Sequence, residues 1–181
     1  MERAATKMTY DQYCLLPEDR NRYQLFDGEL VMTPSPRPRH QRIAVFLVEK
    51  LSAHVRTHDL GEVFAAPLDV VLDEYTVVQP DVFFIRRDRL SIVGEDYVEA
   101  APDLVVEVLS PSTFHIDLRR KMKTYSQFGV EEYWIVDPEE ETVEVFRRSG
   151  DKLQSTAKYS SGQSLESPLL PGFHLAVQDI F

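Results

Sequence analysis

Two acidic residues stand inside segments whose other residues are mostly apolar. Glu107 lies in the run DLVVEVL, and Asp81 lies in VVQPDVFFI, directly after Pro80. Both runs are typical of buried strands, where a lone ionised carboxylate is costly unless a cation, a hydrogen bond or a proton compensates it. Proline within a strand also indicates a bulge or an edge, and bulges often redirect side chains beside active sites. The two acids offer hard oxygen ligands for a divalent metal.

A lysine is predicted to lie near these acids. Asp117 and Lys121 are four residues apart on the helix expected after the Glu107 strand. The link between strand and helix is short, so the helix returns near the carboxyl end of the strand and Lys121 could reach the same site. Two acids, a lysine and a metal suit phosphodiester hydrolysis, because the metal lowers the pKa of a bound water. The ammonium would orient the nucleophile or offset charge on the phosphorane.

The same residues also have purely structural roles open to them. Glu107 could be the buried ion-pair partner of Arg119 or Arg120, since such pairs occur without catalysis. Asp81 could cap a turn. The pair on the helix could be a surface contact that contributes about 0.3–0.5 kcal/mol.

The pattern of the whole chain predicts a mixed sheet flanked by helices, an α/β or α+β fold. Helices are expected over 9–16, over a long segment whose apolar stripe runs from Ile43 to Val55, and over 114–128. Strands are expected over 23–26, 29–32, 62–72, 77–85, 103–109, 133–136, 142–147 and 153–159. Asp27-Gly28 marks the hairpin between the first two strands. Segment 86–98 is expected to be a partly ordered loop, and 164–181 to form short irregular pieces.

Composition excludes several classes of protein. The chain has 181 residues, of which 43% are hydrophobic and 28% charged, which fits one domain over 1–181. The single Cys14 excludes an internal disulfide and a zinc site built from several cysteines. No apolar run approaches the roughly 18 residues of a membrane span, and no signal-peptide core is visible. We therefore predict a cytoplasmic protein without a membrane-spanning segment.

The charge balance bears on nucleic-acid binding. The 20 Lys and Arg residues against 30 Asp and Glu give a net charge of −10, so the molecule as a whole does not attract DNA. Binding would need a local basic face or a metal that offsets the acids. Two clusters could flank a DNA path, or could be ordinary solvated charges: Arg37, Arg39 and Arg42, and Arg119, Arg120, Lys121 and Lys123.

Five blocks of sequence together resemble the Uma family of proposed restriction endonucleases, in the PD-(D/E)XK nuclease superfamily. They run from about Tyr23 to Arg147 in the family's order: YQLFDGELVMTPSPRPRHQRI, PLDVVL, VVQPDVFFI, APDLVVEVLSPST and DLRRKMKTYSQFGVEEYWIVDPEEETVEVFR. The resemblance implies a restriction-endonuclease-like mixed sheet with an N-terminal hairpin and C-terminal strands. It also implies a central Mg²⁺ site, for which Mn²⁺ could substitute.

The resemblance assigns roles to individual residues. Asp81 matches the first acid of the motif and Glu107 the second, so both are expected to bind the metal and to be catalytic. The lysine expected two residues later is replaced by Leu109, and Lys121 is the family's match on the next helix. Glu29 resembles an acid on the first segment of this fold that can add a metal ligand, although it could equally be a solvated hairpin carboxylate.

Four other residues receive lesser roles. His40 resembles the histidine of the family's PSPxHQ stretch, and we interpret it as a packing residue at the start of the long helix. Asp103 shares a strand with Glu107, whereas a metal site requires acids from different strands, so we place it outside the site. Gln79 is expected at the edge of the site, and Tyr125 in the core.

The function predicted from these residues is a metal-dependent endonuclease that hydrolyses phosphodiester bonds, with DNA as a weakly bound substrate. The alternative is a non-catalytic binding or assembly module of the nuclease fold with a relict metal site. The acidic net charge and Leu109 favour that alternative. A third class, compatible with either, is an interaction domain whose hairpin over 142–159 pairs with a second copy to form a homodimer.

Overall fold

The structure is a computed structural model that describes residues 7–17, 21–110 and 114–181, with side chains from residue 118 onward in the last range. Its helices are α1 (Tyr10–Cys14), α2 (Pro38–Thr57) and α3 (Phe114–Phe128), with short 3₁₀ helices η1 (Arg87–Ile92) and η2 (Val177–Asp179). The end of the expected link between strand and helix, residues 111–113, lies outside the described residues.

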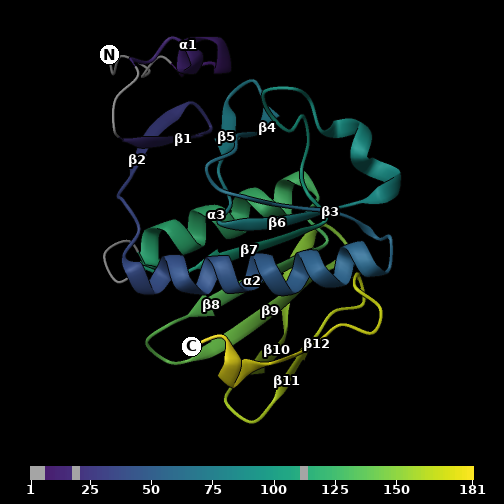
Figure 1. Ribbon diagram of the computed structural model, residues 1–181. Helices are drawn as coiled ribbons and strands as arrows, with labels where there is room; N and C mark the ends of the chain where they lie inside the picture. Colours follow the sequence, from purple (N-terminus) through teal and green to yellow (C-terminus); the bar gives the residue numbers. More distant parts are fainter. Residues whose placement is uncertain (1–6, 18–20, 111–113) are drawn as a thin grey trace.

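A six-stranded mixed sheet forms the centre of the molecule (Figure 1). Its order is β10 (Lys152–Tyr159), β9 (Thr142–Ser149), β8 (Glu132–Asp137), β7 (Leu104–Val108), β6 (Val82–Arg86) and β3 (Gly61–Ala65). Strands β7 and β8 are parallel, and the other neighbouring strands are antiparallel. The predicted mixed sheet flanked by helices is confirmed.

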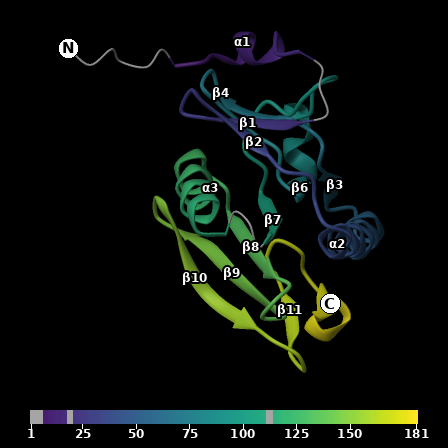
Figure 2. The same ribbon diagram turned by 90° about the vertical axis from the view of Figure 1, so that its left-hand side faces the viewer.

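Each face of this sheet has its own apolar core. On one face, α2 packs against alternate residues of the strands, and the C-terminal segment with β11 (Ser164–Glu166) and β12 (His174–Ala176) extends the same cluster. On the other face lies α3, with the buried Tyr125. Figure 2 shows α2 (blue) and α3 (green) on opposite sides of the sheet. Among the described residues, no helix is long and apolar enough to cross a membrane.

A second, four-stranded sheet also lies on the α3 side, above the central sheet in both views (Figures 1 and 2). Its order is β2 (Glu29–Thr33), β1 (Arg22–Phe26), β5 (Thr76–Val78) and β4 (Val70–Asp73). The predicted β1–β2 hairpin turns at Asp27 and Gly28, both at positive φ (51° and 81°), the backbone that an Asp-Gly turn provides.

The strands predicted over 62–72 and 77–85 are each divided in two. The first divides into β3 and β4 and the second into β5 and β6, and the halves belong to different sheets. A proline stands at each division, Pro67 and Pro80, and proline cannot donate a ladder hydrogen bond. The chain therefore crosses between the two sheets at both places. One consequence is that Asp81, directly before β6, lies where the sheets meet.

Two segments are more regular than expected: 86–98 contains the 3₁₀ helix η1, and 164–181 pairs β11 with β12 and includes η2. The other remaining elements follow their sequence signals. Helix α1 has the expected capping box, in which the Thr9 side chain accepts from the Gln12 backbone and the Gln12 side chain accepts from the Thr9 backbone. Helix α3 spans the predicted residues, and Gly129 follows it at φ 91°. Strand β10 is the last strand of the central sheet. Pairing of that edge with a second copy stays a prediction.

Candidate active site

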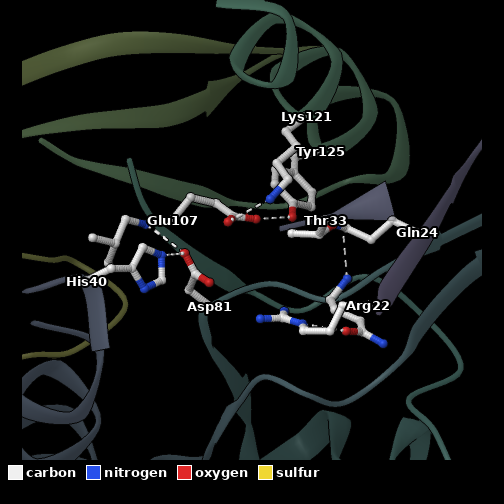
Figure 3. Close-up of polar contacts among 10 residues, drawn as sticks. Arg22, Gln24, Thr33, His40, Asp81, Glu107, Lys121 and Tyr125 are labelled. Carbon is white, nitrogen blue, oxygen red and sulfur yellow. Dashed lines mark hydrogen bonds and ion pairs between the residues drawn. The ribbon is translucent and has the colours of Figure 1, made fainter. Parts of the chain in front are cut away.

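A cavity of about 70 Å³ lies between the two sheets and α3. That volume is enough for several water molecules or a hydrated ion. Its wall includes three of the predicted site residues together with polar side chains of both sheets: Arg22, Gln24, Thr33, His40, Gln79, Asp81, Glu107 and Lys121. Figure 3 labels seven of these eight side chains, all but Gln79, and shows how they lie.

The register of the central sheet brings the two acids together. Val82 of β6 pairs with Val106 of β7 in an antiparallel ladder, and one further step places Asp81 opposite Glu107. Side chains alternate along a strand, and the neighbours Phe83 and Val105 both belong to the core on the α3 face. Both carboxylates therefore lie on the α3 side of adjacent strands.

Glu107 is held by two side chains of α3. Lys121 Nζ donates to Glu107 Oε2 at 2.8 Å, and the hydroxyl of the fully buried Tyr125 donates to Oε1 at 2.6 Å. Burial raises the pKa of Glu107 to about 6, with the positive charge of Lys121 opposing the rise and the negative charge of Asp81 adding to it. The expected core position of Tyr125 is correct, and its hydroxyl also fixes the orientation of Glu107.

Asp81 has different partners. Its Oδ2 accepts from the Val108 backbone N–H at 2.9 Å and lies 3.0 Å from His40 Nε2. Burial acts to raise the pKa of Asp81, but the hydrogen bond from His40 and the charge of Lys121 outweigh it, so the pKa is lowered. Oδ1 has no protein partner among the residues that the structure describes.

His40 has a role that the sequence interpretation missed. It lies in the first turn of α2, at the helix start as expected, but its ring contacts Asp81 instead of serving only to pack the helix start. Burial opposes its protonation, yet the hydrogen bond and charge of Asp81 prevail, and the pKa of His40 is raised. The available signal was the resemblance of its segment, PSPRPRHQ, to the family's PSPxHQ stretch.

The other predicted residues lie elsewhere or at the rim. Glu29 is not among the cavity-lining residues: its side chain is 66% exposed and bonds Arg120 at 3.0 Å. Asp103, fully buried, contacts Arg86 and Arg89 near the start of β7, outside the site as expected. Gln79 lines the cavity. The side chain of Asp117 is outside the described part of α3.

The donor set fits a hard divalent cation with few protein ligands. Within the described ranges, no group of three or more His, Cys, Asp or Glu side chains could hold a metal, and the cavity offers the carboxylates of Asp81 and Glu107. Mg²⁺ is commonly held by one or two carboxylates and retains several waters. A cation there would also offset the negative charge of Asp81, which adds to the effect of burial in raising the pKa of Glu107.

A family model described as "Putative restriction endonuclease", named Uma2, matches residues 9–178. The chain belongs to the Uma2 family. The resemblance seen in the sequence is thereby confirmed, and the family description supports a nuclease.

Two similar proteins match this Uma2 protein over nearly its whole length. An uncharacterized protein of Synechocystis sp. is 26% identical over 180 residues, which cover 97% of this chain and 92% of the relative. A crystal structure from Anabaena variabilis, described as "a putative nuclease belonging to DUF820", superposes with a TM-score of 0.81. It is 22% identical and covers 96% of this chain and 97% of its own, a likeness that shows the fold.

Proposed function

We propose that this Uma2 protein is a Mg²⁺-dependent endonuclease that hydrolyses phosphodiester bonds in DNA. The observation that carries the proposal is the convergence of Asp81, Glu107 and Lys121 on one cavity, with the two acids on adjacent strands. A structural ion pair would need neither the second acid nor the open space beside it. The family description supports the same class of reaction.

The two carboxylates would hold the metal. When bound, the metal would lower the pKa of a water and offset charge on the phosphate. Glu107 is suited to this at neutral pH, because a pKa of about 6 leaves it mainly ionised. Tyr125 keeps its Oε1 in place, while His40 and the Val108 N–H orient Asp81. In the reaction water adds to phosphorus, one P–O ester bond breaks, and the leaving oxygen takes a proton.

Lys121 would supply the positive charge that the motif normally carries two residues after its second acid. That position is Leu109, which also lines the cavity. The Lys121 ammonium contacts Glu107 at 2.8 Å, so it lies at the site although it comes from α3. There it would orient the attacking water or stabilise charge that develops on the phosphate.

Binding of DNA would be weak and sensitive to salt. The two basic clusters lie at the start of α2 and on α3, the helices that bring His40 and Lys121 to the cavity, but part of their charge is already compensated. Arg39 bonds Glu141, and Arg120 bonds Glu29. The remaining cations of the clusters act against a net charge of −10, so binding should be weak, and it should fall as salt rises with a slope set by the number of phosphate contacts.

The test is nicking of supercoiled plasmid with Mg²⁺ or Mn²⁺, with and without a chelator. Asp81→Ala should lose both cleavage and Mn²⁺ binding measured by electron paramagnetic resonance. Lys121→Ala should lose roughly 10²–10³-fold in rate while it retains Mn²⁺ binding, because the ammonium is not a ligand. Asp88→Ala removes an exposed acid on η1 and is the matched control, expected to behave as wild type.

All variants are purified in parallel, because a trace of host nuclease imitates low activity. Equal cleavage by wild type and Asp81→Ala would contradict the enzyme proposal. The non-catalytic module with a relict site would then be the better interpretation.

A further inference from the structure

Arg22 brings a positive charge to the cavity from the opposite sheet. It is the first residue of β1, its side chain is half-buried, and it lines the same cavity as Asp81 and Glu107. Figure 3 shows its guanidinium extending toward the side of the cavity where Asp81 lies. The acids belong to the central sheet and Arg22 to the four-stranded sheet, so the two sheets supply opposite charges to one space.

The charge of Arg22 is not compensated by its neighbours. Glu107 is paired with Lys121 and Asp81 with His40, whereas Arg22 forms no salt bridge with any acid in the described ranges. Its Nε donates to the neutral Gln79 Oε1 at 3.1 Å. A half-buried guanidinium beside a cavity, with a neutral partner, leaves net positive charge available to an anion.

A chain of hydrogen bonds holds this guanidinium in place. Gln79 Nε2 donates to Asp69 Oδ1 at 2.7 Å, and the Tyr13 hydroxyl donates to the same oxygen at 3.2 Å. These contacts fix the Gln79 amide so that its oxygen faces Arg22. Only Nε is used in this way, and neither Nη atom has a protein partner among the described residues. The four N–H donors of the two Nη atoms therefore remain, and one from each Nη forms the fork that matches two phosphate oxygens.

The geometry points to Arg22 as a phosphate-binding residue that donates hydrogen bonds to two non-bridging oxygens of the anion entering the cavity. The identity of that anion as a phosphodiester rests on the proposed function, but the anion site itself does not. In this arrangement the four-stranded sheet binds the substrate phosphate, and the central sheet with α3 carries the groups that act on it. Arg22 would thus contribute affinity that the acidic surface of the molecule does not offer.

The experiment titrates the metal-free full chain with dimethyl phosphate, a minimal phosphodiester, in the presence of chelator. In the NMR spectrum of the wild type, the Nε–H resonance of Arg22 should shift and saturate. The backbone amide resonances of the cavity wall, such as those of Gln79 and Val108, are present in every variant and give the affinity of each protein. Arg22→Gln should weaken binding at least tenfold, and Arg22→Lys should lie between, because lysine keeps the charge without the fork. Arg56→Gln removes an exposed arginine at the far end of α2, and it should bind as wild type does.

Thermal unfolding of each variant shows whether it remains folded. If Arg22→Gln does not fold, Arg22→Lys decides: a severalfold loss supports the proposal, and unchanged affinity overturns it. Equal affinity of Arg22→Gln and wild type, or an equal loss in Arg56→Gln, also overturns it.

The outcome is separable from that of the proposed function. Loss of dimethyl phosphate binding in Arg22→Gln, in a protein that never cleaves DNA, would leave the anion site standing while the nuclease proposal fails. Metal-dependent cleavage with an unchanged KM in Arg22→Gln would contradict the role of Arg22 and leave the nuclease intact.

Discussion

A carboxylate is buried at each end of strand β7, and the two carboxylates differ in how their charge is compensated. Asp103 precedes the strand, fully buried, with Arg86 at 2.8 Å, Arg89 at 2.9 Å and a hydrogen bond from the Arg86 backbone. Glu107, near the other end, has one cation and one hydroxyl, and a second acid stands opposite it. At the first end two arginines contact one acid, whereas at the second Lys121 is, among the described residues, the one cation in contact with Glu107, and Asp81 has His40 as its partner.

This difference shows that burial of an acid does not by itself indicate chemistry. At the Asp103 end two arginines of the protein itself compensate the charge of the carboxylate, so its burial requires no ligand. At the Glu107 end burial raises the pKa to about 6 and a cavity remains beside the acid. A site for a ligand is expected where charge is incompletely compensated and there is space to add the missing charge.

The largest expected effect tests the structural end of β7. Asp103→Asn should lower the free energy of unfolding by about 3 kcal/mol, because two arginines lose their buried counter-charge and a backbone N–H keeps a weaker acceptor. Urea denaturation measures this value. Cleavage per folded molecule should stay as in wild type. A loss under about 1 kcal/mol would mean that Asp103 does not stabilise the fold as its contacts indicate.

A smaller effect separates Glu107 from Asp103 through pH. The pKa of Glu107 is about 6 in the fold against an ordinary value of 4.5, so the unfolded chain loses this proton first as pH rises. Wild-type stability therefore carries a penalty that is absent below about pH 4.5 and complete above about pH 6. Relative to wild type, Glu107→Gln should gain about 2 kcal/mol between pH 4 and pH 7.

Urea denaturation of both proteins across this pH range makes the comparison, since other titrating groups largely cancel in the difference. A difference that stays constant with pH would show that the pKa of Glu107 is not raised. The contrast between the two ends of the strand would then be lost.

The smallest effect concerns Glu29, the acid that the structure leaves at the surface. Its contact with Arg120 is solvent-exposed, so Glu29→Gln should change the free energy of unfolding by less than about 0.5 kcal/mol. Mn²⁺ affinity, measured by electron paramagnetic resonance, should not change. A tenfold loss of Mn²⁺ affinity would instead show that Glu29 is a metal ligand. The metal site would then include the β1–β2 hairpin as well as the Glu107 end of β7.

Much of the fold follows from local signals. The hairpin at Asp27-Gly28, the capping box of α1 and the helix over 114–128 each depend on residues close together in the chain, and each is found as predicted. The strands over 62–72 and 77–85 were wrong in extent. Pro67 and Pro80 were the signals for the division, but which sheet each half joins depends on contacts far along the chain.

The sequence by itself determined that Glu107 and Asp81 would be costly acids within apolar strands, and that Lys121 follows on the next helix. Those conclusions rest on residue type and local periodicity. Only the tertiary structure decided that His40 meets Asp81, that Glu29 faces away, and that Arg22 enters the cavity. The physical reason is that such contacts depend on strand register and on how two sheets and two helices pack, which no local pattern specifies.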